Sequence, residues 1–231
     1  MKKIISSLCF ILITYTAFAQ SFGDNDNPIT FGLMGGSDMA FLQIKSAHRD
    51  LVQTNNTSPF SLGFSADFKF NDYFSLRPAI FYAGKGGSMT ATYTIDPPYK
   101  GANTNVDADN EYTLHYLEIP LQAVGHIPVG DGANIFIGAG PYYSYALNGK
   151  FKQSTGSGPD ISRKLTFGNN GDFSSSDYGI SSVIGFQGQS GWSLSGNLEF
   201  GLTNILRNNY TGFDASQMKT ITVYLTIGQS F

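Results

Sequence analysis

The chain has 231 residues, of which 41% are hydrophobic and 13% charged, and its formal net charge is -3. A weakly acidic chain without a basic patch is not expected to bind nucleic acid. Its 27 glycines, 13 tyrosines and 19 phenylalanines are unusual for a soluble enzyme of this size. They are typical of curved strands that place aromatic rings at a membrane interface.

The first 19 residues have the three parts of a secretory signal peptide. Lys2 and Lys3 form a basic start, residues 4–18 are mostly apolar, and Ala17-Phe18-Ala19 supplies a small-x-small cleavage site. The apolar stretch is too short for a membrane anchor. We therefore predict a signal peptide at 1–19 and a single mature domain at 20–231.

The only cysteine, Cys9, lies in the middle of this apolar stretch. A lipoprotein signal would instead place its cysteine at the end of the stretch, after a small-residue lipobox. Loss of the signal removes two lysines, changes the net charge from -3 to -5 and leaves the mature chain without a thiol. We expect no disulfide and no cysteine-based catalytic or metal site.

Eight segments of the mature chain alternate apolar and polar residues, which is the pattern of strands with one apolar face. In chain order they are 29–37, 60–70, 74–85, 112–127, 133–147, 178–189, 192–202 and 220–231. Short turns that include Asn71-Asp72 and Ser190-Gly191 join some of them into tight hairpins.

The apolar face of these strands points to lipid as its surroundings. The last strand places Ile221, Val223, Leu225, Ile227 and Phe231 on one face and ends the chain there. A soluble domain seldom ends on a strand with an exposed apolar face. A tilted strand crosses the hydrocarbon layer in roughly 9 to 11 residues, and this segment has about that length.

The opposite face carries charged side chains, and exposing a charge to lipid or burying it unpaired in a dry core has a high free-energy cost. They are Asp67, Lys69, Arg77, Lys85, Glu118 and Glu199. A lipocalin-like soluble barrel, the alternative fold, would instead place its apolar residues inside. An eight-stranded barrel is just wide enough to be filled by side chains. We therefore predict that these charges form an ionic network that plugs a polar lumen, with a substrate or ion path as the alternative.

The connections between the predicted strands alternate in length. Segments 41–59, 86–110, 148–177 and 203–218 are long and polar, and the three connections between them are short. Outer-membrane barrels have this arrangement, with long loops outside and both termini in the periplasm. We predict an all-β, eight-stranded antiparallel transmembrane up-and-down β-barrel that crosses the outer membrane many times.

Several motifs resemble a known family over essentially the whole mature chain. They are Phe74-Ser75-Leu76-Arg77-Pro78, Gly84-Lys85-Gly86, Tyr116-Leu117-Glu118-Ile119-Pro120-Leu121, Gly138-Ala139-Gly140-Pro141-Tyr142, Asp177-Tyr178-Gly179 and Gly201-Leu202-Thr203-Asn204-Ile205. The chain resembles the PorT-like outer-membrane β-barrel proteins, often called the porin family. The resemblance implies the outer membrane of a Gram-negative cell, and one branch of the family serves a protein secretion system. The expected partners are therefore outer-membrane lipid, envelope or secretion-system proteins and, through the strand ending at Phe231, the outer-membrane assembly machinery.

An enzyme is the least favoured function. The three histidines are His48, His115 and His126. The last two are eleven residues apart on one predicted strand, about 36 Å, and by parity on opposite faces, so they cannot share a site. One histidine with a serine, His48 or His115 near the outer rim, is the remaining catalytic alternative, and we predict no catalytic residue.

Metal and cofactor motifs are also incomplete. The acidic segments 24–27 and 107–109 lack the full spacing of a calcium loop, and Gly84-Lys85-Gly86 lacks the other residues of a phosphate loop. We expect no metal and no cofactor. The sequence thus predicts a non-enzymatic barrel that binds a ligand or partner through its long loops, especially 148–177, or docks envelope proteins. A narrow gated channel is the alternative, and an outer-membrane lipid-modifying enzyme ranks below it.

Overall fold

The computed structural model describes residues 28–46, 50–57, 59–95, 104–130, 132–155, 159–207 and 215–231. Within these residues the chain forms ten strands: β1 (Ile29–Ser46), β2 (Asp50–Thr57), β3 (Phe60–Asn71), β4 (Phe74–Ile95), β5 (Thr104–Gly130), β6 (Ala133–Ser154), β7 (Ile161–Lys164), β8 (Ser176–Gln187), β9 (Trp192–Gly201) and β10 (Ala215–Ser230). The predicted signal peptide at 1–19 and His48 lie outside the described residues. No helix in the described ranges is long and apolar enough to cross a membrane.

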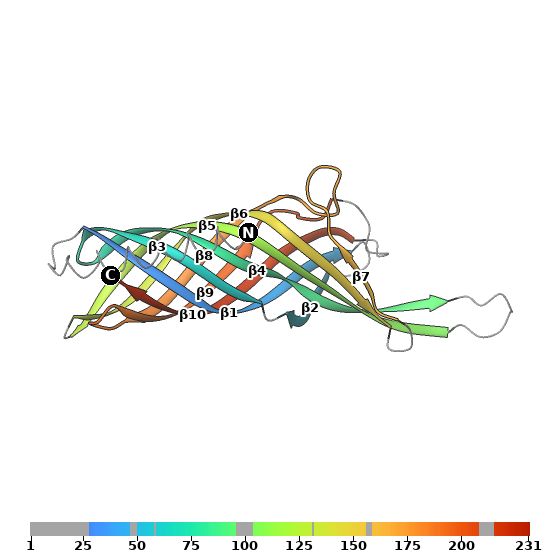
Figure 1. Ribbon diagram of the computed structural model, residues 1–231, viewed down its shortest axis with the longest axis horizontal. Helices are drawn as coiled ribbons and strands as arrows, with labels where there is room; N and C mark the ends of the chain where they lie inside the picture. The colour runs from blue at the N-terminus through green and yellow to red at the C-terminus, as the bar shows by residue number, and fades with distance from the viewer. Residues whose placement is uncertain are drawn as a thin grey trace, which may run out of the picture.

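Eight of the strands close into a barrel (Figure 1). Each pairs antiparallel with its neighbours in the ring β1-β3-β4-β5-β6-β8-β9-β10, and β10 pairs back with β1. The closing register runs from Gly32 opposite Ser230 to Lys45 opposite Gln217. The other two strands extend the wall, because β2 pairs with β1 past the end of β3, and β7 pairs with β6. The predicted all-β, eight-stranded antiparallel barrel is confirmed.

The outer surface of the barrel carries the apolar face that the alternation predicted. Leu225 and Ile227 are 61% and 68% exposed, whereas Thr226 between them is buried. Along β3, Phe60, Leu62 and other apolar residues face outward in the same way. A lipocalin-like barrel would bury these side chains, so the structure excludes that alternative.

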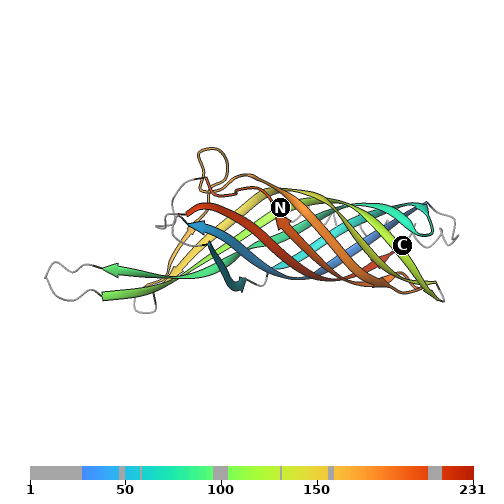
Figure 2. The same ribbon diagram turned by 180° about the vertical axis from the view of Figure 1, so that it is seen from behind.

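The short turns lie at the same end of the barrel as the C-terminus (Figure 2). In the turn between β3 and β4, the Tyr73 backbone N–H donates to Oδ1 of Asn71 at 2.9 Å. The last residue is fixed in the wall, because the Phe231 N–H donates to the Phe31 carbonyl at 2.9 Å and the Phe31 N–H donates to the Phe231 carbonyl at 3.1 Å. The predicted terminal strand therefore belongs to the barrel up to its last residue.

The connections at the other end contain more strand than the sequence predicted. In the predicted loop 86–110, β4 continues to Ile95 and β5 begins at Thr104. Their pairing runs without a break from Phe81 opposite Glu118 to Ile95 opposite Thr104. The polar composition of this segment indicates a loop, but ladder hydrogen bonds join backbone groups and need no apolar side chains. The resulting hairpin projects beyond the other strands (Figure 1).

The three other predicted loops are also partly strand. In 41–59, β1 continues to Ser46 and β2 occupies Asp50–Thr57, and in 148–177, β6 continues to Ser154 and β7 occupies Ile161–Lys164. Of 203–218, the structure assigns the last part to β10, which begins at Ala215. The connections at 41–59 and 86–110 are therefore built largely as extensions of the barrel hairpins, whereas those at 148–177 and 203–218 are strand only in part.

Candidate functional site

Lys85 is completely buried inside the barrel, among three carboxylates. Its Nζ lies 2.6 Å from Glu118 Oε2, 3.3 Å from Glu199 Oε2 and 3.6 Å from Asp177 Oδ2. Inward positions of β4, β5, β9 and β8 supply the four side chains. We call Lys85, Glu118, Asp177 and Glu199 the Lys85 cluster. Charges buried this deeply are stable only when they are paired and hydrogen-bonded.

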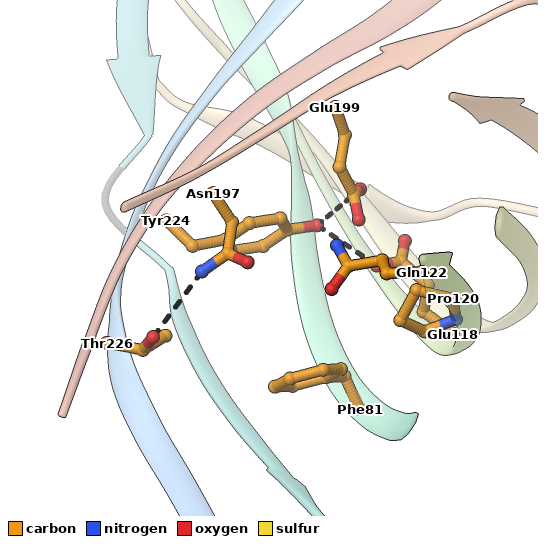
Figure 3. A pocket seen from close by; sticks show the side chains of 8 residues that line it. All are labelled: Phe81, Glu118, Pro120, Gln122, Asn197, Glu199, Tyr224 and Thr226. Carbon is orange, nitrogen blue, oxygen red and sulfur yellow. Dashed lines mark hydrogen bonds between the residues drawn. The ribbon is translucent and has the colours of Figure 1, made fainter. Parts of the chain in front are cut away.

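Hydroxyl groups satisfy the two glutamates of the Lys85 cluster. Ser144 accepts a hydrogen bond from Lys85 Nζ at 3.2 Å and donates to Glu118 Oε2 at 2.7 Å. The Tyr224 hydroxyl lies between the two glutamates, 2.7 Å from Glu199 Oε2 and 3.4 Å from Glu118 Oε1 (Figure 3). These contacts tie β4, β5, β6, β9 and β10 together across the lumen.

Asp177 and two aromatic rings complete the surroundings of Lys85. Oδ2 of Asp177 accepts hydrogen bonds from the hydroxyls of Thr220 at 2.8 Å and Tyr142 at 3.2 Å. The Lys85 Nζ lies 4.1 Å from the centre of the Tyr142 ring and 5.6 Å from that of Tyr116. Ring faces attract a cation at such distances, so the ammonium group is held on several sides.

A second polar group occupies the half of the lumen nearer the short turns. Nη2 and Nε of Arg77 lie 2.6 and 2.7 Å from Asp67 Oδ2. Ser75 donates to Asp67 Oδ1 at 2.8 Å, and its oxygen lies 2.8 Å from Nε2 of His126. The Arg77 guanidinium also covers the ring of Phe136 at 4.6 Å. This group is anchored next to the hairpin that joins β3 and β4.

The six charges predicted to form one network are therefore divided between two groups. Lys85, Glu118 and Glu199 meet in one, Asp67 and Arg77 meet in the other, and Lys69 is exposed and forms no ion pair among the described residues. The sequence did not predict the other residues around Lys85, among them Asp177, Ser144, Tyr142 and Tyr224. The sequence predicts Asp177 at the end of a loop. Its neighbour Tyr178 faces outward, so continuing the alternation by one residue would have placed the Asp177 side chain in the lumen.

Buried apolar side chains fill the lumen on the long-loop side of the Lys85 cluster. We call them the apolar cap: Leu42, Ile44, Met89, Tyr112, Leu114, Tyr116, Ala146, Leu165, Phe173, Ile205, Leu206 and Met218. Leu165, Phe173, Ile205 and Leu206 come from connections between strands. The connections thus fold inward and close this end of the barrel with apolar contacts, which the sequence did not predict.

Asp172 holds the connecting segments of the cap together. Its Oδ2 accepts hydrogen bonds from Arg163 Nη1, from the Thr166 backbone N–H and from the Thr166 hydroxyl, each at 2.9 Å. Its backbone carbonyl accepts from the Arg207 N–H at 3.1 Å. Burial acts to raise the pKa of the Asp172 carboxyl, but the hydrogen bonds from Arg163 and Thr166 outweigh it and the pKa is lowered.

A hollow, which we call the polar hollow, lies on the other side of the Lys85 cluster, toward Arg77, which is opposite its lining residue Gln122. It is lined by Phe81, Glu118, Pro120, Gln122, Asn197, Glu199, Tyr224 and Thr226 (Figure 3). Asn197 Nδ2 donates to the Thr226 hydroxyl at 3.4 Å, and Gln122 Nε2 donates to the Ser181 hydroxyl at 3.2 Å. The hollow therefore connects neutral polar groups with the glutamates of the cluster.

One histidine lies close to a serine, as a hydrolytic site would require. His126 Nε2 is 2.8 Å from the Ser75 hydroxyl and its Nδ1 is 3.3 Å from Asn134 Oδ1. However, Ser75 is completely buried and its proton is donated to Asp67. The serine is therefore a bridge between Asp67 and His126 rather than a nucleophile open to substrate.

The other positions weighed as catalytic or metal-binding alternatives form no assembled site among the described residues. The ring of His115 stacks on that of Tyr82, with ring centres 5.4 Å apart, on the outer face of the barrel. His126 faces the lumen, so the two histidines lie on opposite faces of β5, as predicted. Asp109 accepts a hydrogen bond from Thr90 at 2.6 Å. In the part of the chain that the structure describes, no three histidine, cysteine or acidic residues are grouped to hold a metal ion. The acidic segment 24–27 lies outside that part.

A closed ring of eight tilted strands with an apolar outside and a polar, charged inside defines an integral outer-membrane β-barrel. Residues 18–207 match the family model described as outer membrane protein beta-barrel domain, and the chain belongs to this family. It is accordingly an outer-membrane protein that crosses the bilayer with many strands. The match is to this broad family, and the PorT-like branch remains a prediction.

Similar solved structures are other outer-membrane proteins. The attachment invasion locus protein Ail of Yersinia pestis is 14% identical, with 87% of this chain and 98% of that chain covered and a TM-score of 0.40. Neisserial surface protein A is 14% identical, with 87% and 97% covered and a TM-score of 0.41. OprG of Pseudomonas aeruginosa is 14% identical, with 87% and 95% covered and a TM-score of 0.39. No match is found among curated proteins.

Proposed function

We propose that this protein is a closed, non-enzymatic outer-membrane barrel that binds a partner protein outside the cell through its projecting hairpin of β4 and β5. The observation that carries the proposal is the contrast between the two parts of the molecule. The lumen is filled by the Lys85 cluster and the apolar cap, whereas β4 and β5 continue beyond the barrel (Figure 1).

The filled lumen supports a function other than transport. An ion passing through would have to separate Lys85 from Glu118, and breaking a buried pair by leaving one charge alone costs roughly 3 to 5 kcal/mol. It would then meet the apolar cap, where Leu114 and Phe173 offer no hydrogen bond. Apolar constrictions exclude water and ions. Both layers would have to rearrange for conduction.

The length of the hairpin supports a function at the surface. β4 and β5 have 22 and 27 residues, whereas roughly 9 to 11 residues cross the hydrocarbon layer. At about 3.3 Å per residue, on the order of 35 Å of paired strand lies outside the hydrocarbon. In outer-membrane barrels the long connections are extracellular and the short turns periplasmic. The hairpin therefore projects from the cell.

The free edge of β4 suggests how a partner binds. On one side, β4 pairs with β5 as far as Ile95. On its other side, the described pairing of β4 with β2 is a single pair of residues, Asn55 opposite Ser88. From Met89 onward this edge offers backbone N–H and C=O groups that no described strand pairs. A partner strand can add to such an edge by backbone hydrogen bonds. A surface or secretion-system protein of the envelope is the class of partner that this position allows.

Site-specific cross-linking tests the proposal. A photoreactive residue at Thr90, which is exposed on the hairpin, should cross-link to one discrete protein in intact cells. The matched control at Lys164, exposed on β7, should give less of that product. Shortening the hairpin by joining Ser88 to Glu111 should leave a folded barrel that no longer captures the protein. Equal capture by the shortened barrel would overturn the proposal.

The gated channel is the second candidate, and the polar hollow beside Glu118 and Glu199 is the observation that favours it. The hollow lies in the lumen and reaches Gln122, which is opposite Arg77 in the strand ladder. A channel would therefore require the ion pair of Arg77 and Asp67, the Lys85 cluster and the apolar cap to open together. A lipid-modifying enzyme has weaker support, because Ser75 and His126 meet inside the wall rather than on its lipid face.

A further inference from the structure

Two lysines of neighbouring strands lie directly opposite each other on the outer face of the wall. β7 lies beside β6 (Figure 1), and their register sets Lys150 opposite Lys164. Both side chains are exposed, whereas the adjacent Gly149 and Leu165 are buried. The Leu165 N–H donates to the Gly149 carbonyl at 2.9 Å, which fixes the two strands at this point. Directly opposite residues have Cβ atoms about 5 Å apart, and like charges at such positions repel. An anion between the two lysines would turn this repulsion into attraction.

The carboxylates near these lysines are engaged elsewhere. Asp160 forms an ion pair with Lys152 at 2.9 Å. Glu111 lies opposite Lys152 in the strand ladder and interacts with it electrostatically. Lys150 and Lys164, which we call the lysine pair, form no ion pair among the described residues. In this part of the chain, the protein itself therefore supplies no anion to the lysine pair.

The lysine pair lies just beyond the apolar band, at the long-loop end of the barrel. On the outer face of β6, the exposed large apolar side chains run from Ile135 to Leu147, with Tyr143 and Tyr145 toward the long-loop end. Tyrosine rings in such positions mark the membrane interface. Lys150 is three residues past Leu147, which is roughly 10 Å along the strand and roughly 7 Å in height on a tilted strand. The headgroup layer is about 5 to 8 Å thick on each side of the hydrocarbon, so the lysine pair lies among the headgroups.

We propose that the lysine pair binds the phosphate group of a lipid in the outer leaflet of the membrane. Lysine ammonium groups bind phosphate as point charges, and two of them on one face can hold a single phosphate from both sides. The exposed Ser162, one outward position along β7 from Lys164, can add a hydrogen bond from its hydroxyl. The acyl chains of the lipid would lie against the apolar band, where Tyr145 and Leu147 are exposed. A soluble phosphate would gain the charges but not these apolar contacts.

Lipid binding to the purified barrel tests the site. The mature protein in a neutral detergent is titrated with monophosphoryl lipid A, a phosphorylated and acylated disaccharide, and bound lipid is counted by native mass spectrometry. A lysine near anionic lipid strengthens the attraction about fivefold. Lys164→Gln should therefore weaken binding roughly fivefold, and Lys164→Glu, which changes the charge by two, roughly 30-fold. Lipid A from which the phosphate has been removed should bind the wild type as weakly as lipid A binds Lys164→Glu.

A stability measurement separates loss of the site from loss of the fold. A glutamate opposite Lys150 replaces repulsion by an ion pair, so Lys164→Glu in vesicles of phosphatidylcholine should resist urea at least as well as the wild type. The matched control is Lys219→Glu, which makes the same charge change on the outer face of β10 and should retain lipid A binding.

Three results would overturn the proposal. One is equal binding of lipid A to the wild type and to Lys164→Glu, and another is equal binding of lipid A and its dephosphorylated form to the wild type. The third is displacement of lipid A by inorganic phosphate at the same concentration, because it would mean a site for soluble anions rather than for a lipid.

Discussion

Nζ of Lys85 and Oε2 of Glu118 lie 2.6 Å apart, with side chains that are 0% and 2% exposed. The two residues come from β4 and β5, and Asp177 and Glu199 reach the same ammonium group from β8 and β9. One lysine therefore joins distant parts of the barrel wall across its interior. Its loss would leave several buried carboxylates without a cation.

Lys85→Met should strongly destabilise the barrel. The variant keeps most of the side-chain volume but leaves Glu118 without its partner, so the free energy of unfolding should fall by about 3 to 5 kcal/mol. Reversible unfolding from lipid vesicles measures this difference. Lys164→Met, an exposed control, should change it by less than about 0.5 kcal/mol. The Lys85 cluster would not be a structural centre if the two variants behaved alike.

Leu225→Arg and Thr226→Arg compare the two faces of one strand. Leu225 faces lipid at mid-strand, so an arginine there should cost about 2 to 4 kcal/mol. Thr226 lines the polar hollow with Glu118 and Glu199, where an arginine can pair with a carboxylate and should cost less. Unfolding from vesicles gives both values. A larger loss for the inward substitution would indicate that the lumen has no room for the added side chain.

The orientation of the barrel predicts which positions are reached from outside the cell. Single cysteines at Thr90 and Lys164 should react with an impermeant maleimide on whole cells, and a cysteine at Ser190 should react only after the outer membrane is opened. Ser190 is preferred to its neighbour Gly191, which has a φ of 83° and whose added Cβ would lie 2.5 Å from the Ser230 carbonyl. The reverse labelling pattern would mean an inverted barrel.

Acid should loosen the apolar cap through Asp172. Because the pKa of this carboxyl is lowered in the folded state, its contribution to stability is complete above its unfolded pKa of about 4 and is lost as the pH falls through the lowered folded value. Hydrogen exchange of the segment 163–175 should therefore increase below about pH 4. Asp172→Asn should show the faster exchange already at pH 7. A cap equally protected in both proteins would contradict this role.

The sequence predicted the wall of the barrel better than its contents. Alternation decides the face of each side chain, so Leu225 and Thr226 could be placed outside and inside from the sequence alone. It does not decide the depth at which two strands meet, because depth depends on the register and tilt of the closed sheet. Lys85 and Glu118 were therefore predicted as lumen charges, but their separation from Asp67 and Arg77 was not.

Two further features gave no signal in the sequence. Phe173 and Ile205 close the barrel from connecting segments, which have no periodicity that could predict burial. The hairpin up to Ile95 is polar and was predicted as loop, because its pairing depends on backbone hydrogen bonds.

Conductance of the purified mature protein in a planar lipid bilayer tests the closed lumen most directly. The Lys85 cluster and the apolar cap lie one behind the other, so we expect no stepwise current under applied voltage at neutral pH. A parallel preparation of Thr90→Cys, labelled with the impermeant maleimide from one side of the bilayer only, would show that the barrel is inserted. Regular current steps from inserted wild-type protein would contradict the closed lumen and favour the channel.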